Sequence, residues 1–384
     1  MSQVILPGGT IGILGAGQLG RMMTTAAKHM GYRVAVVGAS PDDPAAQVAD
    51  HFIEGDLMSP ESAARLARVA GAITVEIENV SVPGLEAAAC EVPVRPSAAV
   101  VRIAQHRLAE KQALEAMGVP VAPFREVTGA AQLREALESI GFPAILKTAR
   151  GGYDGKGQVR IADPGQVERA FEELGAGRVD LVVEAVVPFE KEISVVVARD
   201  AAGRIAAYPV VENEHRRGIL HRSIAPARVG TNVRERAVEA ARDIAEGLGL
   251  VGVLAVEMFA LPGGEIVVNE LAPRPHNSGH FTLDACATSQ FEQAIRAVAG
   301  LGLGSTEQLV PAVMLNILGE HLPAVLEKYT SLMQDPHVKV HLYGKAQARP
   351  GRKMGHILVM DRDLSRCVER ADALWSWLTG ERRD

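Results

Sequence analysis

The feature that most constrains the fold is a change in the spacing of apolar residues along the chain. In about the first hundred residues, short apolar runs alternate with helically spaced segments, which predicts a doubly wound α/β domain. The runs are Thr10–Leu14, Arg33–Val37 and Ala72–Ile77. Farther along, longer strands often alternate polar with apolar residues, which favours antiparallel pairing. These strands are Lys191–Ala198, Arg204–Val211, Gly252–Phe259 and Glu265–Leu271.

A domain boundary is expected where the helix from about Gln105 to Met117 ends. Gly118 and Pro120 follow this helix, and glycine and proline are common helix termination signals. The C-terminal part holds three strand candidates and a closing helix with an apolar stripe. These elements are Ala312–Leu318, Val338–Leu342, His356–Met360 and Leu364–Leu378.

Composition excludes several classes of protein. The 384 residues suggest two or three domains, and 47% hydrophobic and 22% charged residues are near globular averages. No stretch is long and apolar enough for a bilayer, and the N-terminus lacks the basic start of a signal peptide, so we expect a cytoplasmic protein. Three widely spaced cysteines indicate neither disulfides nor zinc. A net charge of −6 argues against a nucleic-acid surface.

The first glycine-rich segment is GAGQLG, from Gly15 to Gly20. It lies between a predicted strand and a helix, where backbone N–H groups favour a phosphate. A dinucleotide site would also place an acidic residue at the end of the second strand, but Asp42 and Asp43 come several residues late. Three interpretations stay open: a dinucleotide site, a single-phosphate site, and a tight turn that packs helix on sheet.

The second glycine-rich segment is GGYDGKG, from Gly151 to Gly157, after the predicted strand Pro143–Lys147. Its amides suit a flexible loop over a polyphosphate, and the cations Lys147, Arg150 and Lys156 flank it. It lacks the GK[ST] ending of a P-loop. The alternative is a long hairpin turn.

Two glutamates are predicted to face one another on a hairpin. A two-residue turn at Gly263-Gly264 would place Glu257 directly opposite Glu270. Opposed carboxylates destabilise a sheet unless a cation lies between them, and Mg²⁺ prefers one or two carboxylates with phosphate oxygens and water. Asn269 is a further candidate ligand. The alternative is two solvated glutamates on an edge hairpin.

Two polar segments complete the candidate site. Arg274 and Ser278, directly after the hairpin, suit an oxyanion or phosphate, and His276 suits substrate orientation or proton transfer, although a lone histidine is often structural. Near the C-terminus a basic cluster precedes a predicted strand, and it is either a phosphate site or a solvated turn. Its members are Lys345, Arg349, Arg352 and Lys353.

In this order the segments resemble the ATP-grasp superfamily and, more closely, the 5-(carboxyamino)imidazole ribonucleotide synthase family, over essentially the whole chain. The resemblance is carried by GAGQLGRM, by TVEIENV at Thr74–Val80, by GGYDGKGQ, by NELAPRPHNSGH at Asn269–His280 and by RPGRKMGH at Arg349–His356. Biotin carboxylases and D-alanine ligases share the grasp but lack HNSGH followed by RPGRKMGH. The last two segments are therefore the most specific.

The resemblance implies an ATP-grasp fold of α/β and α+β type. It implies an N-terminal doubly wound α/β domain at residues 1–104, an ATP-grasp domain at 105–310 with a glycine-loop lid at about 118–187, and a small β-rich C-terminal domain at 311–384. The implied cofactors are ATP and Mg²⁺, the implied substrates are 5-aminoimidazole ribonucleotide and bicarbonate, and the implied assembly is a homodimer. Neither a nucleic acid nor a membrane is an expected partner.

The resemblance also implies roles for individual residues. The expected ATP-binding residues are Arg107, Lys147, Gly152, Tyr153, Asp154, Gly155, Lys156, Gly157, Gln158, Glu184, Ala185, Val186, Val187, Glu192, His215, Asn269 and Glu270. The expected Mg²⁺ ligands are Glu257 and Glu270. The expected substrate contacts are Gln18, Leu19, Glu76, Tyr153, Asp154, Arg274, His276, Asn277, Ser278, Lys345 and Arg352. The candidate catalytic residues are Tyr153, Asp154, Lys156, Arg274, His276 and Lys345.

The implied reaction begins with attack of bicarbonate on the γ-phosphorus of ATP, which forms carboxyphosphate. The glycine loop would close over this short-lived anhydride before the ribonucleotide amine takes up the carboxylate or released carbon dioxide. Three other functions stay open. They are a formate-dependent glycinamide ribonucleotide transformylase, a nicotinamide-dependent dehydrogenase that rests on GAGQLG alone, and a non-catalytic nucleotide-binding regulator.

Overall fold

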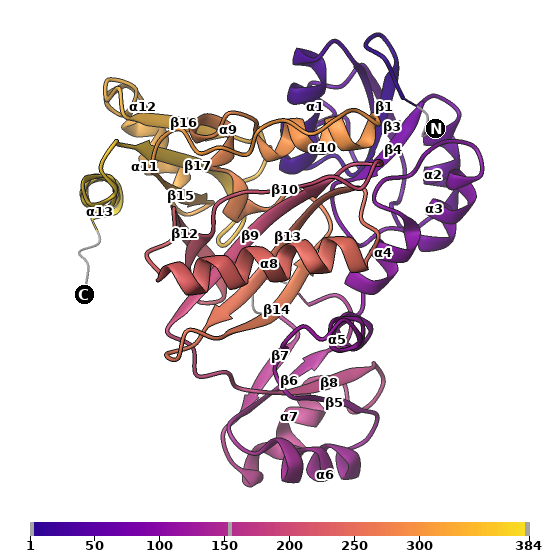
Figure 1. The fold of residues 1–384 in the computed structure, drawn as a ribbon, viewed down its shortest axis with the longest axis vertical. Helices are drawn as coiled ribbons and strands as arrows, with labels where there is room; N and C mark the ends of the chain where they lie inside the picture. Colours follow the sequence, from indigo (N-terminus) through magenta and orange to yellow (C-terminus); the bar gives the residue numbers. More distant parts are fainter. Residues whose placement is uncertain (1–3, 153–155, 381–384) are drawn as a thin grey trace.

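The computed structural model describes residues 4–152 and 156–380, and their strands form three sheets (Figure 1). The N-terminal sheet is parallel with the order β3-β2-β1-β4, as expected for a doubly wound domain. Its strands are β1 (Thr10–Leu14), β2 (Arg33–Gly38), β3 (His51–Glu54) and β4 (Ala72–Val75). Its helices are α1 (Gln18–His29), α2 (Pro60–Ala67), α3 (Val82–Ala89) and α4 (Ala98–Ala104).

A small antiparallel sheet forms a separate lobe at the bottom of Figure 1. Its order is β5-β8-β6-β7, and two helices pack their apolar side chains against it to make its core. The elements of this lobe are β5 (Phe124–Val127), α6 (Ala130–Ile140), β6 (Ala144–Thr148), β7 (Gln158–Ile161), η1 (Pro164–Gln166), α7 (Val167–Glu173) and β8 (Leu181–Ala185). Helix α5 (Arg107–Ala116) leads into the lobe, close to the predicted bounds.

The central sheet has nine strands in the described part of the chain, eight of them in the order β14-β13-β9-β11-β12-β15-β17-β16, with β10 paired to β9. All its pairings are antiparallel, which confirms the expectation from the alternating patterns. The strands are β9 (Lys191–Arg199), β10 (Ile205–Ala207), β11 (Val211–Arg216), β12 (Ile219–Ala225), β13 (Gly252–Ala260), β14 (Ile266–Ala272), β15 (Ala312–Leu318), β16 (Val338–Leu342) and β17 (Lys353–Met360).

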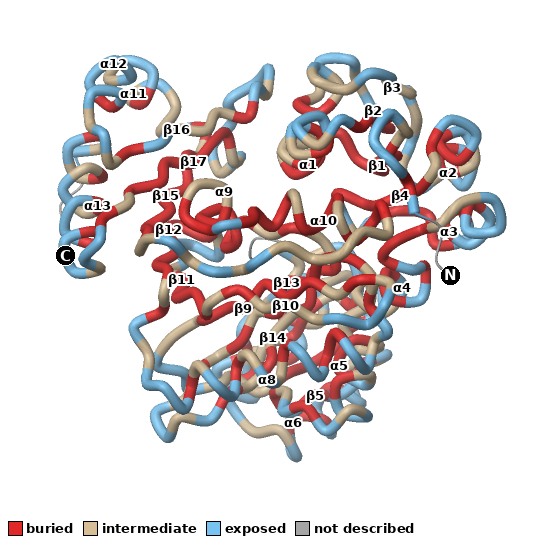
Figure 2. The backbone as a smooth tube through the Cα atoms, turned by 45° about the horizontal axis from the view of Figure 1, so that its top comes forward, coloured by how far each residue is buried: buried red, intermediate tan, exposed pale blue. Residues whose placement is uncertain are grey.

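Helices cover both faces of this sheet. Val195 and Val197 pack in one core with α8 (Thr231–Gly247), whereas Val196 and Ala198 pack with α10 (Gln290–Val298), because successive strand side chains point to opposite faces. The core on the α10 side also includes residues of α1, so the N-terminal domain packs against α10. Figure 2 shows buried backbone along β9, β13 and α10, with exposed turns at the periphery.

The C-terminal elements extend the central sheet. Strand β12 pairs with β15, so hydrogen bonding continues across the expected boundary between residues 310 and 311. Buried Val368 and Trp375 of the closing helix pack against β15 and β17. The remaining helices are η2 (Asn277–Gly279), α9 (Thr282–Ala285), α11 (Leu322–Glu327), α12 (Tyr329–Leu332) and α13 (Leu364–Thr379).

One predicted strand is wrong as a continuous element. Arg204–Val211 divides into β10 and the start of β11, with Pro209 between them. Proline lacks the N–H that a sheet ladder needs, so the pairing is interrupted there. Within the described residues, no helix is long and apolar enough to cross a membrane.

Candidate functional site

The first glycine loop holds a carboxylate of the protein itself. The backbone N–H groups of Gly17 and Leu19 both donate to the Glu76 carboxylate, which follows β4; the Leu19 bond is 3.1 Å long. A Cβ atom on Gly15 would lie 2.7 Å from the Glu76 side chain, so this glycine is needed for close approach. The geometry therefore supports the tight-turn interpretation, because the amides that a phosphate would use are occupied.

Burial and hydrogen bonding have opposite effects on the pKa of the Glu76 carboxyl group. Burial raises the pKa of Glu76, whereas hydrogen bonds from the amides of Gly17, Gly20 and Leu19 lower it, as does the nearby charge of Lys345; the net pKa is raised. The absence of an acidic residue at the end of β2 already argued against a dinucleotide. The occupied amides add a second objection to that interpretation.

The second glycine loop joins β6 to β7 in the small lobe. Thr148 N–H donates to the Gly157 carbonyl (2.8 Å), and both Gly151 and Gly157 have positive φ angles, 77° and 67°. The predicted site residues Tyr153, Asp154 and Gly155 lie outside the described residues, and Lys156 and Gln158 are exposed. The loop therefore connects two hairpin strands, as the alternative interpretation required, and it does so next to a cluster of cations.

That cation cluster connects the small lobe, α5 and the central sheet. Lys147 of β6 and Lys111 of α5 lie 2.9 Å and 3.2 Å from the same Glu184 carboxylate oxygen. Arg107 of α5 donates to the Gly152 carbonyl at 2.8 Å. Arg107 Nη1 also lies 3.3 Å from Glu270 Oε2. The arginine thus links the glycine loop to the predicted metal-ligand strand.

The pKa values in this cluster are shifted by burial and by interactions between neighbouring charged side chains. Burial lowers the pKa of Lys147, and this effect outweighs the attraction of Glu184. Burial alone would raise the pKa of Glu184, but Lys147 and Lys111 together lower it, because one carboxylate serves two ammonium groups. Burial and the charge of Glu270 raise the pKa of Glu110 to about 8. Arg107, Lys111 and Lys147 thus lie among the carboxylates of Glu110, Glu184 and Glu270, and a polyphosphate would compete with these carboxylates for the three cations.

The predicted pairing of Glu257 with Glu270 is confirmed, although the turn differs from the prediction. Gly264 N–H donates to Leu261 O, and Gly264 has a φ of 82°, so the loop is one residue longer than the expected two-glycine turn. A bulge at Asn269, which has no partner in β13, shifts the register back by one residue. The extra loop residue and the bulge offset each other, so Glu257 still pairs with Glu270.

The two opposed carboxylates contact cations or proton donors on either side. Glu257 Oε1 lies 3.0 Å from His276 Nε2, and Glu270 contacts Arg107 as described above. Burial and the charge of Glu270 raise the pKa of Glu257 to about 7. The Glu257 side chain is 24% exposed and that of Glu270 42%, so Glu257 at least is not a solvated edge residue.

Within residues 4–152 and 156–380, no three His, Cys, Asp or Glu side chains gather closely enough to hold a metal on their own. A pair of carboxylates fits Mg²⁺, which takes its remaining oxygens from phosphate and water. Zinc or another metal that needs three or four protein ligands does not fit this arrangement.

The segment after β14 brings its polar groups toward the carboxylate pair. Arg274 forms two hydrogen bonds with the Glu78 carboxylate, at 2.6 Å and 3.3 Å. His276 is held between Glu257 and the Ser278 hydroxyl, and burial lowers its pKa well below the ordinary value. Asn277 Oδ1 is buried with no hydrogen-bond partner in the described structure, so it is an acceptor that a ligand donor would satisfy.

The other residues expected near ATP lie along β8, β9 and β11. The side chains of Glu192 and His215 contact each other across neighbouring strands. Burial lowers the pKa of His215, but the hydrogen bond and charge of Glu192 raise it, with a net increase. The N–H of Ala185 donates to Pro123 O, while Val186 and Val187 follow the end of β8.

The C-terminal basic loop meets the N-terminal domain near the first glycine loop. Gln47 Nε2 donates to Gly344 O at 2.8 Å, and the Lys345 ammonium lies 5.8 Å from the centre of the Tyr343 ring. Arg352 is exposed and donates to Gln347 O at 2.8 Å. The structure thus brings Lys345 near Glu76 of the N-terminal domain, whereas the hydrogen bond of Arg352 stays within its own loop, as the solvated-turn interpretation expects.

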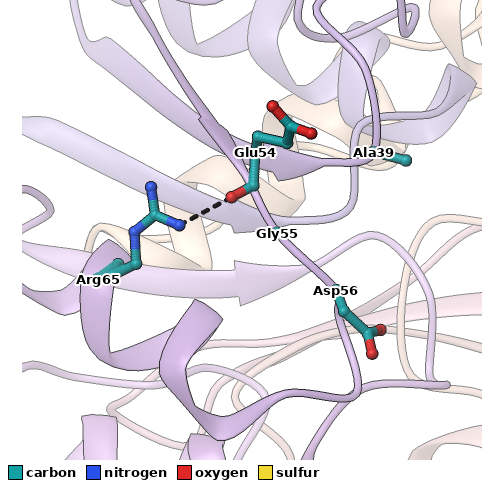
Figure 3. Close-up of a pocket in the computed structure, with 5 residues that line it drawn as sticks. All are labelled: Ala39, Glu54, Gly55, Asp56 and Arg65. Atoms are coloured by element: carbon teal, nitrogen blue, oxygen red, sulfur yellow. Dashed lines mark hydrogen bonds between the residues drawn. The ribbon is translucent and has the colours of Figure 1, made fainter.

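A separate pocket opens beside β3. Its lining contains none of the predicted site residues, and Arg65 donates to the Glu54 backbone carbonyl at 2.8 Å (Figure 3). The carboxylates of Glu54 and Asp56 point away from each other in this view. The pocket is lined by Ala39, Glu54, Gly55, Asp56 and Arg65.

Sequence reasoning missed three charged residues of the site. Glu110 and Lys111 follow Arg107 on α5 at spacings of three and four residues, which places all three on one helix face. That spacing was the signal that could have found them. Glu78 lies two residues after Glu76, and no sequence signal indicated its pairing with Arg274.

Family models match the chain in three consecutive parts. Residues 9–105 match a ribonucleotide synthetase preATP-grasp domain, residues 112–291 an ATP-grasp domain, and residues 312–370 a phosphoribosylaminoimidazole carboxylase C-terminal domain. The predicted ATP-grasp fold, with an N-terminal α/β domain and a small C-terminal domain, is confirmed.

Similar proteins match over nearly the whole chain. The N5-carboxyaminoimidazole ribonucleotide synthase of Bacillus subtilis (strain 168) is 44% identical over 97% of each chain, and that of Brucella melitensis is 43% identical over 91% of this chain and 96% of the relative. An ADP complex of N5-carboxyaminoimidazole ribonucleotide synthetase has a TM-score of 0.93 at 45% identity, covering 98% of this chain and 99% of the other. The Aspergillus clavatus enzyme with ADP and 5-aminoimidazole ribonucleotide has a TM-score of 0.92 at 32% identity, covering 98% and 100%.

Proposed function

We propose that this chain, which belongs to the N5-carboxyaminoimidazole ribonucleotide synthase family of ATP-dependent ligases, carboxylates 5-aminoimidazole ribonucleotide with bicarbonate at the expense of ATP in purine biosynthesis. The predicted family and enzyme class are confirmed. The observation that carries the proposal is the opposed pair Glu257 and Glu270 beside the cations of α5 and β6. This arrangement is suited to phosphoryl transfer from ATP, because it supplies both metal ligands and charges for phosphate oxygens.

ATP would lie between the small lobe and the central sheet. Lys147 and Arg107 would contact its phosphates, and the glycine loop Gly152–Gln158 would cover them. Two observations support these roles: Arg107 donates to the Gly152 carbonyl, and Lys147 lies on β6, the strand that precedes the loop. Glu184 would keep Lys147 in place until the nucleotide binds. Towards the other end of the nucleotide would lie Ala185, Val186, Val187, Glu192 and His215.

Glu257 and Glu270, with Asn269 beside them, would hold Mg²⁺. The bound ion would offset charge on the phosphoryl oxygens of ATP. Glu270 would also orient Arg107, which it already contacts. His276, by donating to Glu257, would fix the direction of that carboxylate.

The ribonucleotide would lie between the first glycine loop and the C-terminal basic loop. Because Glu76 occupies the amides of the first loop, the phosphate would be held by Lys345 and Arg352. The other groups in contact with this substrate would be Gln18, Leu19, Glu76, Tyr153, Asp154, Arg274, His276, Asn277 and Ser278.

In the reaction, bicarbonate attacks the γ-phosphorus of ATP and ADP leaves, which gives carboxyphosphate. Lys147 and Lys156 stabilise charge on the transferred group. The amine of the ribonucleotide then takes up the carboxyl carbon and phosphate leaves, while the closed loop excludes water. Asp154 positions the amine, and Tyr153, Arg274, His276 and Lys345 complete the surroundings of the reacting groups.

Three further properties are part of this proposal. The domains divide at residues 104/105 and 310/311, with the lid at about 118–187. The enzyme acts in the cytoplasm, where ATP and bicarbonate are available. It assembles as a homodimer, and sedimentation of the purified chain tests this last property directly.

The experiment that tests the function measures phosphate release with ATP, bicarbonate and 5-aminoimidazole ribonucleotide, omitting each in turn. We expect release to require all three. Formate in place of bicarbonate tests the transformylase alternative, and NADH fluorescence tests the dehydrogenase alternative. ATP binding without any carboxylate-dependent turnover would instead favour the non-catalytic regulator and would contradict the proposal.

A further inference from the structure

His276 is held from both sides of its ring. Nε2 lies 3.0 Å from Glu257 Oε1, and Nδ1 lies 2.9 Å from the Ser278 hydroxyl. The Ser278 backbone N–H also points at Nδ1, with a separation of 3.4 Å. A backbone N–H can only donate, so Nδ1 carries a lone pair and the ring proton sits on Nε2, facing the carboxylate.

Behind Ser278, a chain of hydrogen bonds runs through the buried interior of the central sheet. Ser278 Oγ lies 2.9 Å from Ser194 Oγ on β9, and Asn213 Nδ2 on β11 lies 2.9 Å from the same Ser194 oxygen. Ser223 Oγ on β12 lies 2.8 Å from Asn213 Oδ1. The three serines have no solvent exposure and Asn213 has 6%. Three neighbouring strands thus contribute one polar side chain each.

The direction of every bond in this chain follows from its end at His276, where Nδ1 accepts. A hydroxyl has one hydrogen, so Ser278, which must donate to His276 Nδ1, accepts from Ser194. Ser194 therefore accepts in turn from the Asn213 amide, whose carbonyl oxygen accepts from Ser223. Reversing any one link would leave a buried hydrogen bond unmade.

We propose that Ser194, Asn213 and Ser223 are positioning residues that hold the Ser278 hydroxyl as a donor to His276 Nδ1 and so fix the orientation of the ring for the reaction. They do not touch the substrate. They act through Ser278, so that the Nε2–H of His276 always faces Glu257. This inference rests on the proposed function, which places His276 beside the reacting groups.

The first test reads the tautomer without any substrate. In the full chain labelled with ¹⁵N-histidine, nitrogen chemical shifts distinguish a protonated from an unprotonated ring nitrogen, and comparison with His276→Gln assigns the signal. We expect the wild-type ring to carry its proton on Nε2 alone. A wild-type ring with the proton on Nδ1, or a mixture of both forms, would overturn the proposal even if no variant folded.

The second test measures turnover. Ser194→Ala removes the donor to Ser278 and should lower kcat by up to about 10-fold, the factor expected for the loss of one hydrogen bond. Ser223→Ala lies farther along the chain and should have a smaller effect. KM for ATP should change by less than about twofold, because the nucleotide contacts are elsewhere. Both variants should keep the ring proton on Nε2, because the Ser278 N–H still donates to Nδ1, but the Nδ1 signal should shift as the Ser278 hydroxyl loses its fixed orientation.

The matched control is Ser62→Ala, which removes another buried serine hydroxyl with one hydrogen bond, to Asp56 O at 2.6 Å, in the N-terminal domain. It should leave kcat and the His276 signal unchanged. If Ser194→Ala changes kcat no more than Ser62→Ala does, the chain is structural and the proposal is overturned. If wild-type protein shows the expected tautomer but no ribonucleotide-dependent turnover, the proposed function fails while the ring geometry stands.

Discussion

The two glycine-rich loops look alike in sequence and differ in what surrounds them. Each follows a strand and is rich in glycine, the sequence pattern that favours phosphate. In the first loop, the amides of Gly17 and Leu19 already bind the Glu76 carboxylate. Beside the second loop stand Lys147 and Arg107, and Arg107 contacts its Gly152 carbonyl. One loop is filled by an anion of the protein, whereas the other is bordered by cations.

The difference shows that the ligand of a glycine loop is decided by side chains from other elements. Glu76 comes from the end of β4, and Arg107 comes from α5. Glycines permit close approach of either partner, but they do not choose its charge. The first loop therefore organises the protein, and the second is the better candidate for a nucleotide.

The largest effect is expected beside the second loop, from Glu270→Gln. This change removes one proposed metal ligand and the partner of Arg107, so kcat should fall more than about 100-fold, because even outer partners of metal ligands are worth 10- to 100-fold. The melting temperature should stay the same or rise, since repulsion with Glu257 is relieved. Glu265→Gln, at an exposed position in the same hairpin, is the control. Near-wild-type turnover in Glu270→Gln would remove the metal assignment.

The next effect separates the two loops directly. Glu76→Ala would leave the amides of Gly17 and Leu19 without their acceptor and should reduce the free energy of unfolding by about 2–3 kcal/mol. Added phosphate should restore part of this loss, since the first loop would then resemble an open anion site. Chemical denaturation with and without phosphate measures both. An unchanged unfolding free energy would mean that the carboxylate is not what satisfies this loop.

A smaller effect concerns the substrate phosphate. Because Glu76 occupies the amides of the first loop, we expect the basic C-terminal residues to bind this phosphate. Arg352→Ala should raise KM for the ribonucleotide about ten- to hundredfold, the loss of a charge-assisted contact of about 1.5–3 kcal/mol. KM for ATP should barely move. If both constants stay at their wild-type values, Arg352 belongs to a solvated turn. Melting temperature on the same preparation checks that the C-terminal elements remain in place.

The smallest effect tests why the second loop contains glycine. Gly157 has a φ of 67°, and a Cβ atom there would lie 2.7 Å from Thr148 Oγ1. Gly157→Ala should therefore cost about 1–2 kcal/mol of stability in the small lobe. Gly129, in the same lobe, has a φ of −160° and open space around its Cβ position, so Gly129→Ala should stay within about 0.5 kcal/mol. Equal losses in the two variants would contradict the requirement for positive φ.

Local pattern was enough to predict much of this protein. Apolar periodicity predicted β1, β15 and β16 with their observed bounds, because a strand with a buried face must repeat every second residue or form a continuous apolar run. It also predicted antiparallel pairing in the middle of the chain. The motif order predicted the family, because several short segments in a fixed sequence are far more specific than any one of them.

The pairing of Glu257 with Glu270 was predicted correctly from an incorrect turn. The extra loop residue and the bulge at Asn269 offset each other, and neither was visible in the sequence. Such compensation depends on the neighbouring strand β9, which holds β13 in place along its whole length. Sequence spacing could therefore predict that Glu257 faces Glu270, but it could not predict the longer loop and the bulge that produce this pairing.

Tertiary structure alone decided which charges meet. Glu76 and the first loop, Arg274 and Glu78, and the buried chain from Ser223 to His276 join segments far apart in sequence. A polar residue in a sequence has no preferred partner until folding excludes water, and a buried group must then find whichever donor or acceptor lies within reach. The sequence therefore determined the elements and the family, while packing of three strands and two loops determined the partners of each charged group.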